Sequence, residues 1–198
     1  WLETPPLTTI AARWEADGHR VTSLVLTQTA PADYPALRPH RLDVGLVRDA
    51  GGKLEVTVLP ATIREAETDI PEARGLPAPS LVFPNYNDHG YAKVALDERS
   101  LAFVRENLDR IDDTLLRLQL WASLWNMVRD QQLKSTEYLA LVRSRVVPEA
   151  MPELVEAVTT NAISAIGRYV PEEWRDREAH AFAEAAWTAL KAATSNDL

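Results

Sequence analysis

The chain has 198 residues, of which 46% are hydrophobic and 25% are charged, and this composition predicts a soluble globular protein with a buried core. Its formal net charge of -8 disfavours nucleic-acid binding. No stretch reaches the roughly 20 apolar residues of a membrane span, and the N-terminus lacks the pattern of a secretion signal. We therefore expect no nucleic-acid and no membrane partner. The absence of cysteine excludes disulfides and thiolate zinc sites and fits a cytoplasmic location.

The first half of the chain favours strands. Asp17-Gly18 is a dipeptide typical of tight turns and predicts a hairpin over residues 12–28. Alternating apolar and polar residues over 41–46 resume over 54–58, after turn residues 49–52, which predicts a second hairpin with one apolar face. Shorter strands are predicted over 62–70, 80–83 and 91–96. Several short strands at this spacing indicate a β-sandwich.

Helical periodicity begins at Asp97. Acidic residues occupy the first turn of a predicted helix in which Leu101, Val104 and Leu108 recur at helical spacing. Four more helices are expected. Asp112 or Asp113 caps the first, which carries the stripe Leu116, Leu120, Leu124 and Val128, and Ser135 caps the second, which carries Leu139, Val142 and Val146. The third follows Pro148 and runs from Pro152 to about Ile166, where Gly167 closes it, and the fourth begins at Pro171, with Trp174, Phe182, Ala186 and Leu190 as its buried candidates.

The order of these elements predicts an α+β fold in two segregated parts. An antiparallel β-sandwich is followed by an all-α, solenoid-like helical array, and a βαβ sheet is disfavoured. We expect a β-sandwich domain over residues 1–80 and a partial helical C-terminal domain over 97–198. Residues 81–96 are expected to form linking strands between them.

Few residues suggest chemistry. His180 and Glu184 are four residues apart and could face one metal, but a zinc helix of the His-Glu-x-x-His type needs a second histidine and an intervening base. We interpret this pair as part of a solvated helical face. The histidines His19, His40 and His89 lie in separate turn-like segments and are predicted to be surface residues.

One polar loop and two tryptophans have alternative interpretations. Residues 84–93 gather Asn, Asp, His, Tyr and Lys between apolar strands and could line a site, or their Asn and Asp side chains simply form turns around Gly90. Trp121 and Trp125 could form a ligand cage, but aromatic residues at helical spacing are typical of a core. Arg129 suits the end of its helix. We identify no catalytic, cofactor-binding or metal-ligating residue in this chain.

Three stretches, in order, resemble signatures of the bacterial aminopeptidase N family of zinc aminopeptidases. They are Pro84-Asn85 through Tyr91-Ala92-Lys93, Leu96 to Leu101, and Trp121 to Asp130. Weaker similarities are found at Trp1 to Pro5, which resembles the join between catalytic domain and sandwich, at Tyr34-Pro35 with Arg38 to Arg41, and at Tyr169 to Arg175. The chain departs from the family at Tyr86 to His89, where an acidic run is usual, and at Asn126 and Val128, where Asp and Thr are usual.

The resemblance implies a fragment. The family's Gly-Ala-Met-Glu-Asn motif, its zinc helix and its third glutamate ligand have no counterpart here. The chain is therefore expected to be a non-catalytic part whose parent removes N-terminal residues from peptides, with zinc in the parent and no cofactor in this chain. Its expected partners are the catalytic domain of its own parent and the parent's peptides, and its first residue, Trp1 instead of Met, fits this expectation. The alternative is an independent peptide- or protein-binding module with no peptidase parent.

Overall fold

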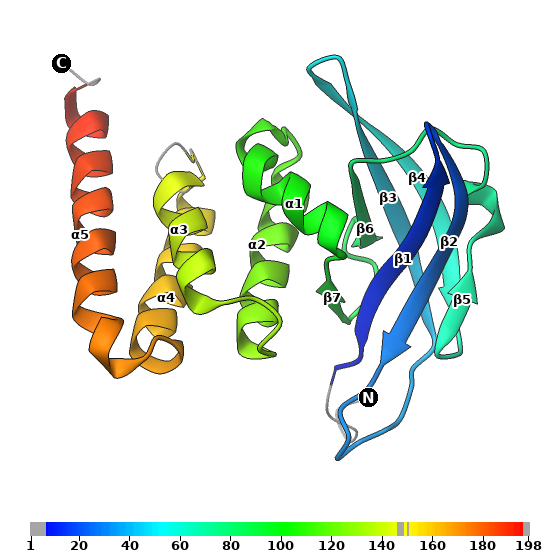
Figure 1. Ribbon diagram of the computed structural model, residues 1–198, viewed down its shortest axis with the longest axis horizontal. Coiled ribbons are helices and arrows are strands. Elements are labelled where there is room, and N and C mark those ends of the chain that lie inside the picture. Colours follow the sequence, from blue (N-terminus) through cyan, green and yellow to red (C-terminus); the bar gives the residue numbers. More distant parts are fainter. Residues whose placement is uncertain (1–6, 146–148, 150, 196–198) are drawn as a thin grey trace. The chain divides into compact units, whose positions relative to one another are not determined.

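A computed structural model describes residues 7–145, 149 and 151–195. Strands precede helices, as predicted, and the α+β class with a sandwich and a helical array is confirmed (Figure 1). The chain divides into two compact units, the first ending at Ser123 and the second beginning at Leu124. Among the described residues, no helix is both long enough and apolar enough to cross a bilayer.

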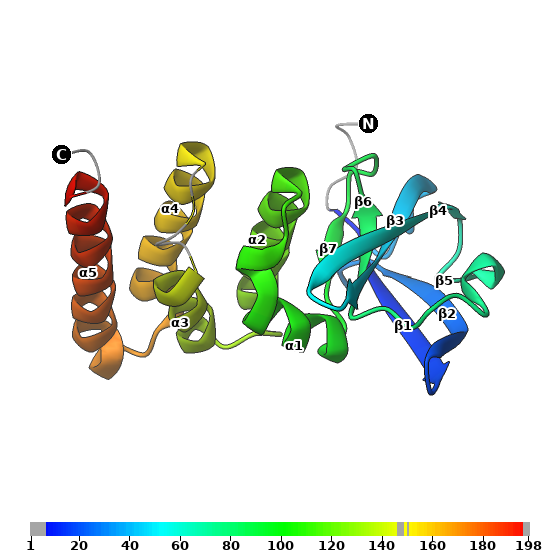
Figure 2. The same ribbon diagram turned by 90° about the horizontal axis from the view of Figure 1, so that it is seen from above.

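The strands of the first unit form two sheets. The first sheet has the order β5-β2-β1-β7, formed by Glu67–Asp69, Arg20–Thr29, Thr9–Asp17 and Lys93–Ala95. The second has the order β4-β3-β6, formed by Lys53–Ile63, His40–Ala50 and Leu81–Tyr86. Figure 2 shows the two layers from above, with β1 and β2 in blue and β3 and β4 in cyan.

One strand pair departs from the expected antiparallel arrangement. β7 pairs with β1 in parallel, whereas the other strand pairs of the two sheets are antiparallel. β7 follows β6, which belongs to the other sheet. The chain therefore crosses between sheets before β7, and no hairpin forces an antiparallel direction.

Both predicted hairpins are present. β1 and β2 are joined through Gly18, which has a φ of 59°. β3 and β4 are joined by Gly51 and Gly52, with φ of 72° and 104°. In the β3–β4 turn φ is positive at both central residues, as a type I′ hairpin turn requires, and glycine adopts it without a steric cost.

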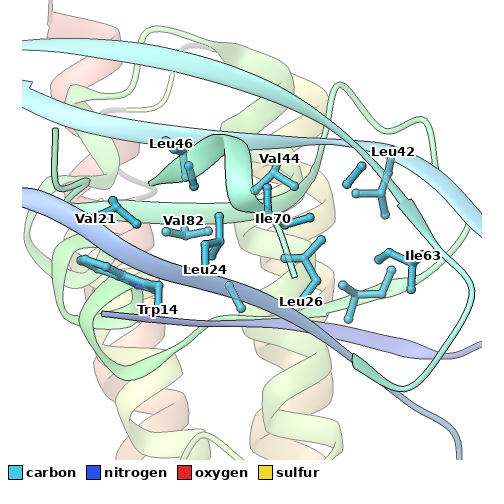
Figure 3. Packing of buried hydrophobic residues seen from close by; sticks show 14 residues of the cluster. Trp14, Val21, Leu24, Leu26, Leu42, Val44, Leu46, Ile63, Ile70 and Val82 are labelled. Atoms are coloured by element: carbon cyan, nitrogen blue, oxygen red, sulfur yellow. The ribbon is translucent and has the colours of Figure 1, made fainter. Parts of the chain in front are cut away.

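The core of the sandwich lies between the sheets. Figure 3 shows Leu24 and Leu26 of β2 facing Leu42, Val44 and Leu46 of β3. The rest of the cluster is formed by Ile10, Ala12, Trp14, Val21, Ala61, Ile63, Ile70, Ala73 and Val82. Burial of these side chains supplies the main stabilisation of the sandwich.

Our prediction of which residues of β4 form the apolar, buried face was wrong. Val56 and Val58 are 39% and 40% exposed, whereas Ala61 and Ile63 are buried. The two-residue turn pairs Ala50 with Lys53, and this register places Val44 opposite Leu59. A shift of one residue in register exchanges the faces of a strand, so the turn decides which residues of β4 face the core.

The outer face of the second sheet is buried at β6, although it is exposed at β4. Leu81 and Phe83 alternate with the core residue Val82 along β6, and all three are buried. Helix α1, Glu98–Asn107, lies against β6. The Ser100 hydroxyl accepts a hydrogen bond of 2.9 Å from the Val82 N–H. This bond satisfies a backbone donor of an edge strand that has no further strand beside it.

Five α-helices and two short 3-10 turns are described. The α-helices after α1 are α2 (Thr114–Arg129), α3 (Ser135–Arg145), α4 (Pro152–Tyr169) and α5 (Glu172–Ser195), and the short turns are Pro71–Ala73 and Leu108–Arg110. Asp97 caps α1, and Asp113 accepts from the Leu116 N–H at 3.1 Å, which confirms the cap predicted for α2. Gly167 does not end α4, because the helix continues to Tyr169 and Pro171 follows the cap residue Val170. Pro148 lies outside the described residues.

The buried face of α5 also differs from our prediction. Trp174 and Leu190 are 43% and 54% exposed and Ala186 is exposed, while Phe182 is half-buried. Instead, Glu178 is buried, and it lies one turn before Phe182 on the face that contacts α3 and α4. Phe182 lies on this face, whereas Ala186 and Leu190 line a hollow with Val155 and Thr159 of α4 and remain exposed.

Candidate functional site

The candidate site is built at the end of the sandwich where the described chain begins. Thr9, the first residue of β1, pairs with Thr29 at the end of β2 and with Lys93 at the start of β7. The Lys93 N–H donates to the Thr8 carbonyl at 2.9 Å. We call this end, with the loops over residues 30–39 and 85–93, the entry end. In Figure 1 the start of β1 and the connection from β2 to β3 lie together at the bottom of the sandwich.

A buried polar contact connects the two sheets at the entry end. Thr8 Oγ1 and His40 Nε2 are 2.9 Å apart, and both residues are buried. His40 was predicted to be a surface residue, and that prediction was wrong because His40 begins β3 inside the sandwich. Burial, with a smaller contribution from Arg38, lowers the pKa of the His40 imidazole. The neutral ring is therefore the form that the fold favours.

The polar loop over residues 85–93 is braced by its own side chains. Asn85, Asn87 and Asp88 have φ of 72°, 64° and 57°, a region in which Asn and Asp are among the best tolerated non-glycine residues. The buried Asn85 amide donates to the Gly90 carbonyl at 2.7 Å and accepts from the Gly90 N–H at 2.6 Å. The interpretation of this segment as side-chain turns around Gly90 is thus confirmed.

The same loop also lines a hollow. His89 Nε2 lies 3.4 Å from Asp43 Oδ2, and the Asn87 amide donates to the same oxygen at 3.2 Å. The hollow has a volume of about 380 Å³ and is lined by Arg41, Leu42, Asp43, Pro60 and His89. It therefore offers one imidazole, one carboxylate and one guanidinium to a polar group. This set can hold a ligand by hydrogen bonds and charge, but within the described residues no group of three or more potential metal ligands is found.

The other candidate residues are exposed on their own elements or serve packing. His19 is exposed in the turn between β1 and β2, and His180 and Glu184 are exposed on α5. Trp121 is 3% exposed and belongs to the core, as predicted. Trp125 is half-buried, with its ring 5.8 Å from that of Tyr138 and 5.6 Å from that of Tyr169. These ring contacts show that Trp125 packs against other aromatic side chains.

One buried ionic cluster was missed from the sequence. The Glu178 carboxylate accepts from Arg143 at 2.7 Å and from Arg177 at 3.0 Å. Burial alone raises the pKa of Glu178, but the hydrogen bonds from Arg143 and Arg177 lower it overall. The sequence signal for this cluster is a carboxylate on the face of α5 that packs against α3 and α4. A buried position is rarely charged unless the charge is paired.

These features define a class of protein part, a β-sandwich followed by stacked helices. The family model of the ERAP1-like C-terminal domain matches residues 81–197, and the chain belongs to this family. The resemblance indicated by the sequence motifs is confirmed, because the chain is also 35% identical over 202 residues to an aminopeptidase N of Streptomyces lividans.

The matches cover small parts of larger proteins. The alignment with the Streptomyces lividans protein covers 98% of this chain but 24% of that protein. The chain is also similar to the crystal structure of Legionella pneumophila aminopeptidase A in complex with aspartic acid, at 13% identity and a TM-score of 0.48 over 96% of this chain and 23% of that one. The chain thus spans about a quarter of the length of the aminopeptidase N that it matches.

Proposed function

We propose that this chain is the non-catalytic part of a zinc-dependent aminopeptidase N, whose parent removes N-terminal residues from peptides. The observation that supports this best is the identity of 35% to an aminopeptidase N along 98% of the chain. The chain covers 24% of that protein, which leaves room for a catalytic segment elsewhere in the parent.

The chain itself acts as a scaffold that holds and covers the active site. We propose a β-sandwich domain over residues 1–80 and a partial helical domain over 97–198, with linking strands over 81–96. The Asp97 side chain, which accepts from the N–H groups of Arg99 and Ser100, supports a helical start at this point. β6 and β7 each join one of the two sheets, so the proposed link is firmly attached to the sandwich.

Three finer points belong to the same proposal. The zinc is held by the parent and not by this chain, because a catalytic zinc needs about three protein ligands and an open position for water. The partners are the parent's own catalytic domain and its peptide substrates. The location is cytoplasmic, which the absence of cysteine supports.

The test compares the 198-residue chain with the parent protein that contains it. We expect about one zinc per parent molecule and chelator-sensitive hydrolysis of aminoacyl-anilides, with neither in the chain alone. Tightly bound zinc and turnover in the chain alone would overturn the scaffold assignment. A parent with no zinc and no aminopeptidase activity would overturn the family function and favour an independent binding module.

A further inference from the structure

A hollow on the outer face of the second sheet brings opposite charges together. Arg41 and Asp43 alternate with the core residue Leu42 along β3, so their side chains leave the strand on the same face. The hollow that they line has a volume of about 380 Å³ and is completed by Pro60 of β4 and by His89. This volume lies at the lower end of the range of small-molecule sites, so the hollow suits one small ligand.

The carboxylate in this hollow is fixed through one of its two oxygens. The Asn87 amide donates to Asp43 Oδ2 at 3.2 Å, and His89 Nε2 lies 3.4 Å from the same oxygen. The other oxygen, Oδ1, accepts no hydrogen bond from any residue that the structure describes. The Asp43 side chain keeps 24% of its surface exposed. Its Oδ1 atom is therefore available to a positively charged donor in the hollow.

The guanidinium in this hollow has no role in holding the fold. Arg41 is exposed, and within the described parts of the chain it forms neither a hydrogen bond nor an ion pair. It does not pair even with Asp43, although alternate residues of a strand are separated by only about 6.5 Å. The two opposite charges thus face the same hollow and leave space between them for a ligand.

We propose that this hollow binds a free α-amino acid with an apolar side chain. The Arg41 guanidinium holds the carboxylate of the ligand through paired N–H donors, and Asp43 Oδ1 accepts a hydrogen bond from its ammonium group. The side chain lies against the apolar part of the hollow, which is formed by Leu42 and Pro60.

The pair of protein charges selects a zwitterion. A ligand with only a negative charge is repelled by the Asp43 carboxylate, and a ligand with only a positive charge is repelled by the Arg41 guanidinium. An α-amino acid carries both charges on one carbon atom, which matches the short separation of the two side chains. The inference goes beyond the proposed function and does not depend on it, because this chain's own residues form the site.

Titration of the 198-residue chain with L-leucine, followed by amide NMR spectroscopy, tests this site. We expect saturable shifts of the backbone amides of residues 41–43 and 89–90. The Kd should be roughly 1 mM, an affinity in keeping with a ligand of so few atoms. N-acetyl-L-leucine lacks the ammonium group and L-leucinamide lacks the carboxylate, so each should bind at least about tenfold more weakly.

Two variants separate the contributions of the two charges. Arg41→Gln should weaken the binding of L-leucine about tenfold and remove the preference for L-leucine over L-leucinamide. Asp43→Asn should weaken it similarly and remove the preference over N-acetyl-L-leucine. The matched control is Arg168→Gln, which changes an exposed arginine of α4 and should leave the Kd unchanged. Circular dichroism checks that each variant is folded, and the two analogues keep the test decisive if one is not.

Several results would overturn the amino-acid site. They are a lack of saturation at about ten times the expected Kd, equal binding of L-leucine and its two analogues, and an unchanged Kd in either folded variant, Arg41→Gln or Asp43→Asn. Saturable shifts confined to residues outside 41–43 and 89–90 would show that the location is wrong. None of these results decides the proposed function, because the chain is tested without the catalytic segment that we propose for its parent.

Discussion

Gly45 and Tyr86 are in contact across the outer face of the second sheet. A Cβ atom built on Gly45 would meet Tyr86 Cδ2 at 2.9 Å. The Tyr86 ring is fixed from its other end, because its hydroxyl donates to Asp113 Oδ2 at 2.7 Å. Burial and this carboxylate raise the pKa of Tyr86 to about 12, so the hydroxyl remains a donor at neutral pH.

This contact predicts the effect of adding one methyl group. Gly45→Ala should lower the free energy of unfolding by ~1–3 kcal/mol, because overpacking forces the ring or the strand to move. Urea denaturation measures the change. In a Tyr86→Ala background the same substitution should cost clearly less, and an equal cost in both backgrounds would show that the ring is not the obstacle.

The two tryptophans of α2 should differ in their contribution to stability. Trp121→Ala should cost ~3–5 kcal/mol because the side chain is buried. Trp125→Ala should cost less, since this ring is half-buried and keeps part of its surface in water. Thermal or urea unfolding of both variants gives the comparison, and a larger loss for Trp125→Ala would contradict the packing described here.

The Glu178 cluster should make the helical unit sensitive to acid. The pKa of Glu178 is lowered in the folded protein below 4.5, the usual value of a glutamate, so the unfolded state binds more protons between the two values. The stabilisation is present above the unfolded pKa and is lost as the pH falls through the folded pKa.

We therefore expect Glu178→Gln to be less stable than the unmodified chain at pH 7 by ~1–3 kcal/mol, with the difference shrinking as the pH falls below about 4.5. The free energy of unfolding measured from pH 7 to pH 3 provides the test. The matched control is Glu184→Gln, which changes an exposed carboxylate on the same helix and should leave the curve unchanged.

His40 should affect the sandwich in a higher pH range. In the folded state its pKa lies below 6.5, the usual value of a histidine, so the unfolded chain takes up a proton first. Stability should therefore be complete above about 6.5 and fall as the pH decreases below it. His40→Gln, which keeps a polar partner for Thr8, should flatten the stability curve between pH 6.5 and the folded pKa, whereas His19→Gln in the exposed turn should not.

The sequence by itself determined the order of elements, the two hairpins and the family. Local chemistry was sufficient for these. Gly18 and the Gly51-Gly52 pair adopt positive φ in their turns, Asp97 and Asp113 cap helices through nearby N–H groups, and the family motifs lie in continuous stretches. Each of these signals acts over a few residues, so periodicity and capping rules can detect it.

Only the tertiary structure decided which faces are buried and which distant residues meet. Alternation alone did not show that Ala61 and Ile63, and not Val56 and Val58, face the core, because the turn sets the register. Similarly, His40 meets Thr8 across 32 positions and Glu178 meets Arg143 across 35. These pairs form because packing of sheets and helices brings residues together in space, and no local property of the chain encodes that proximity.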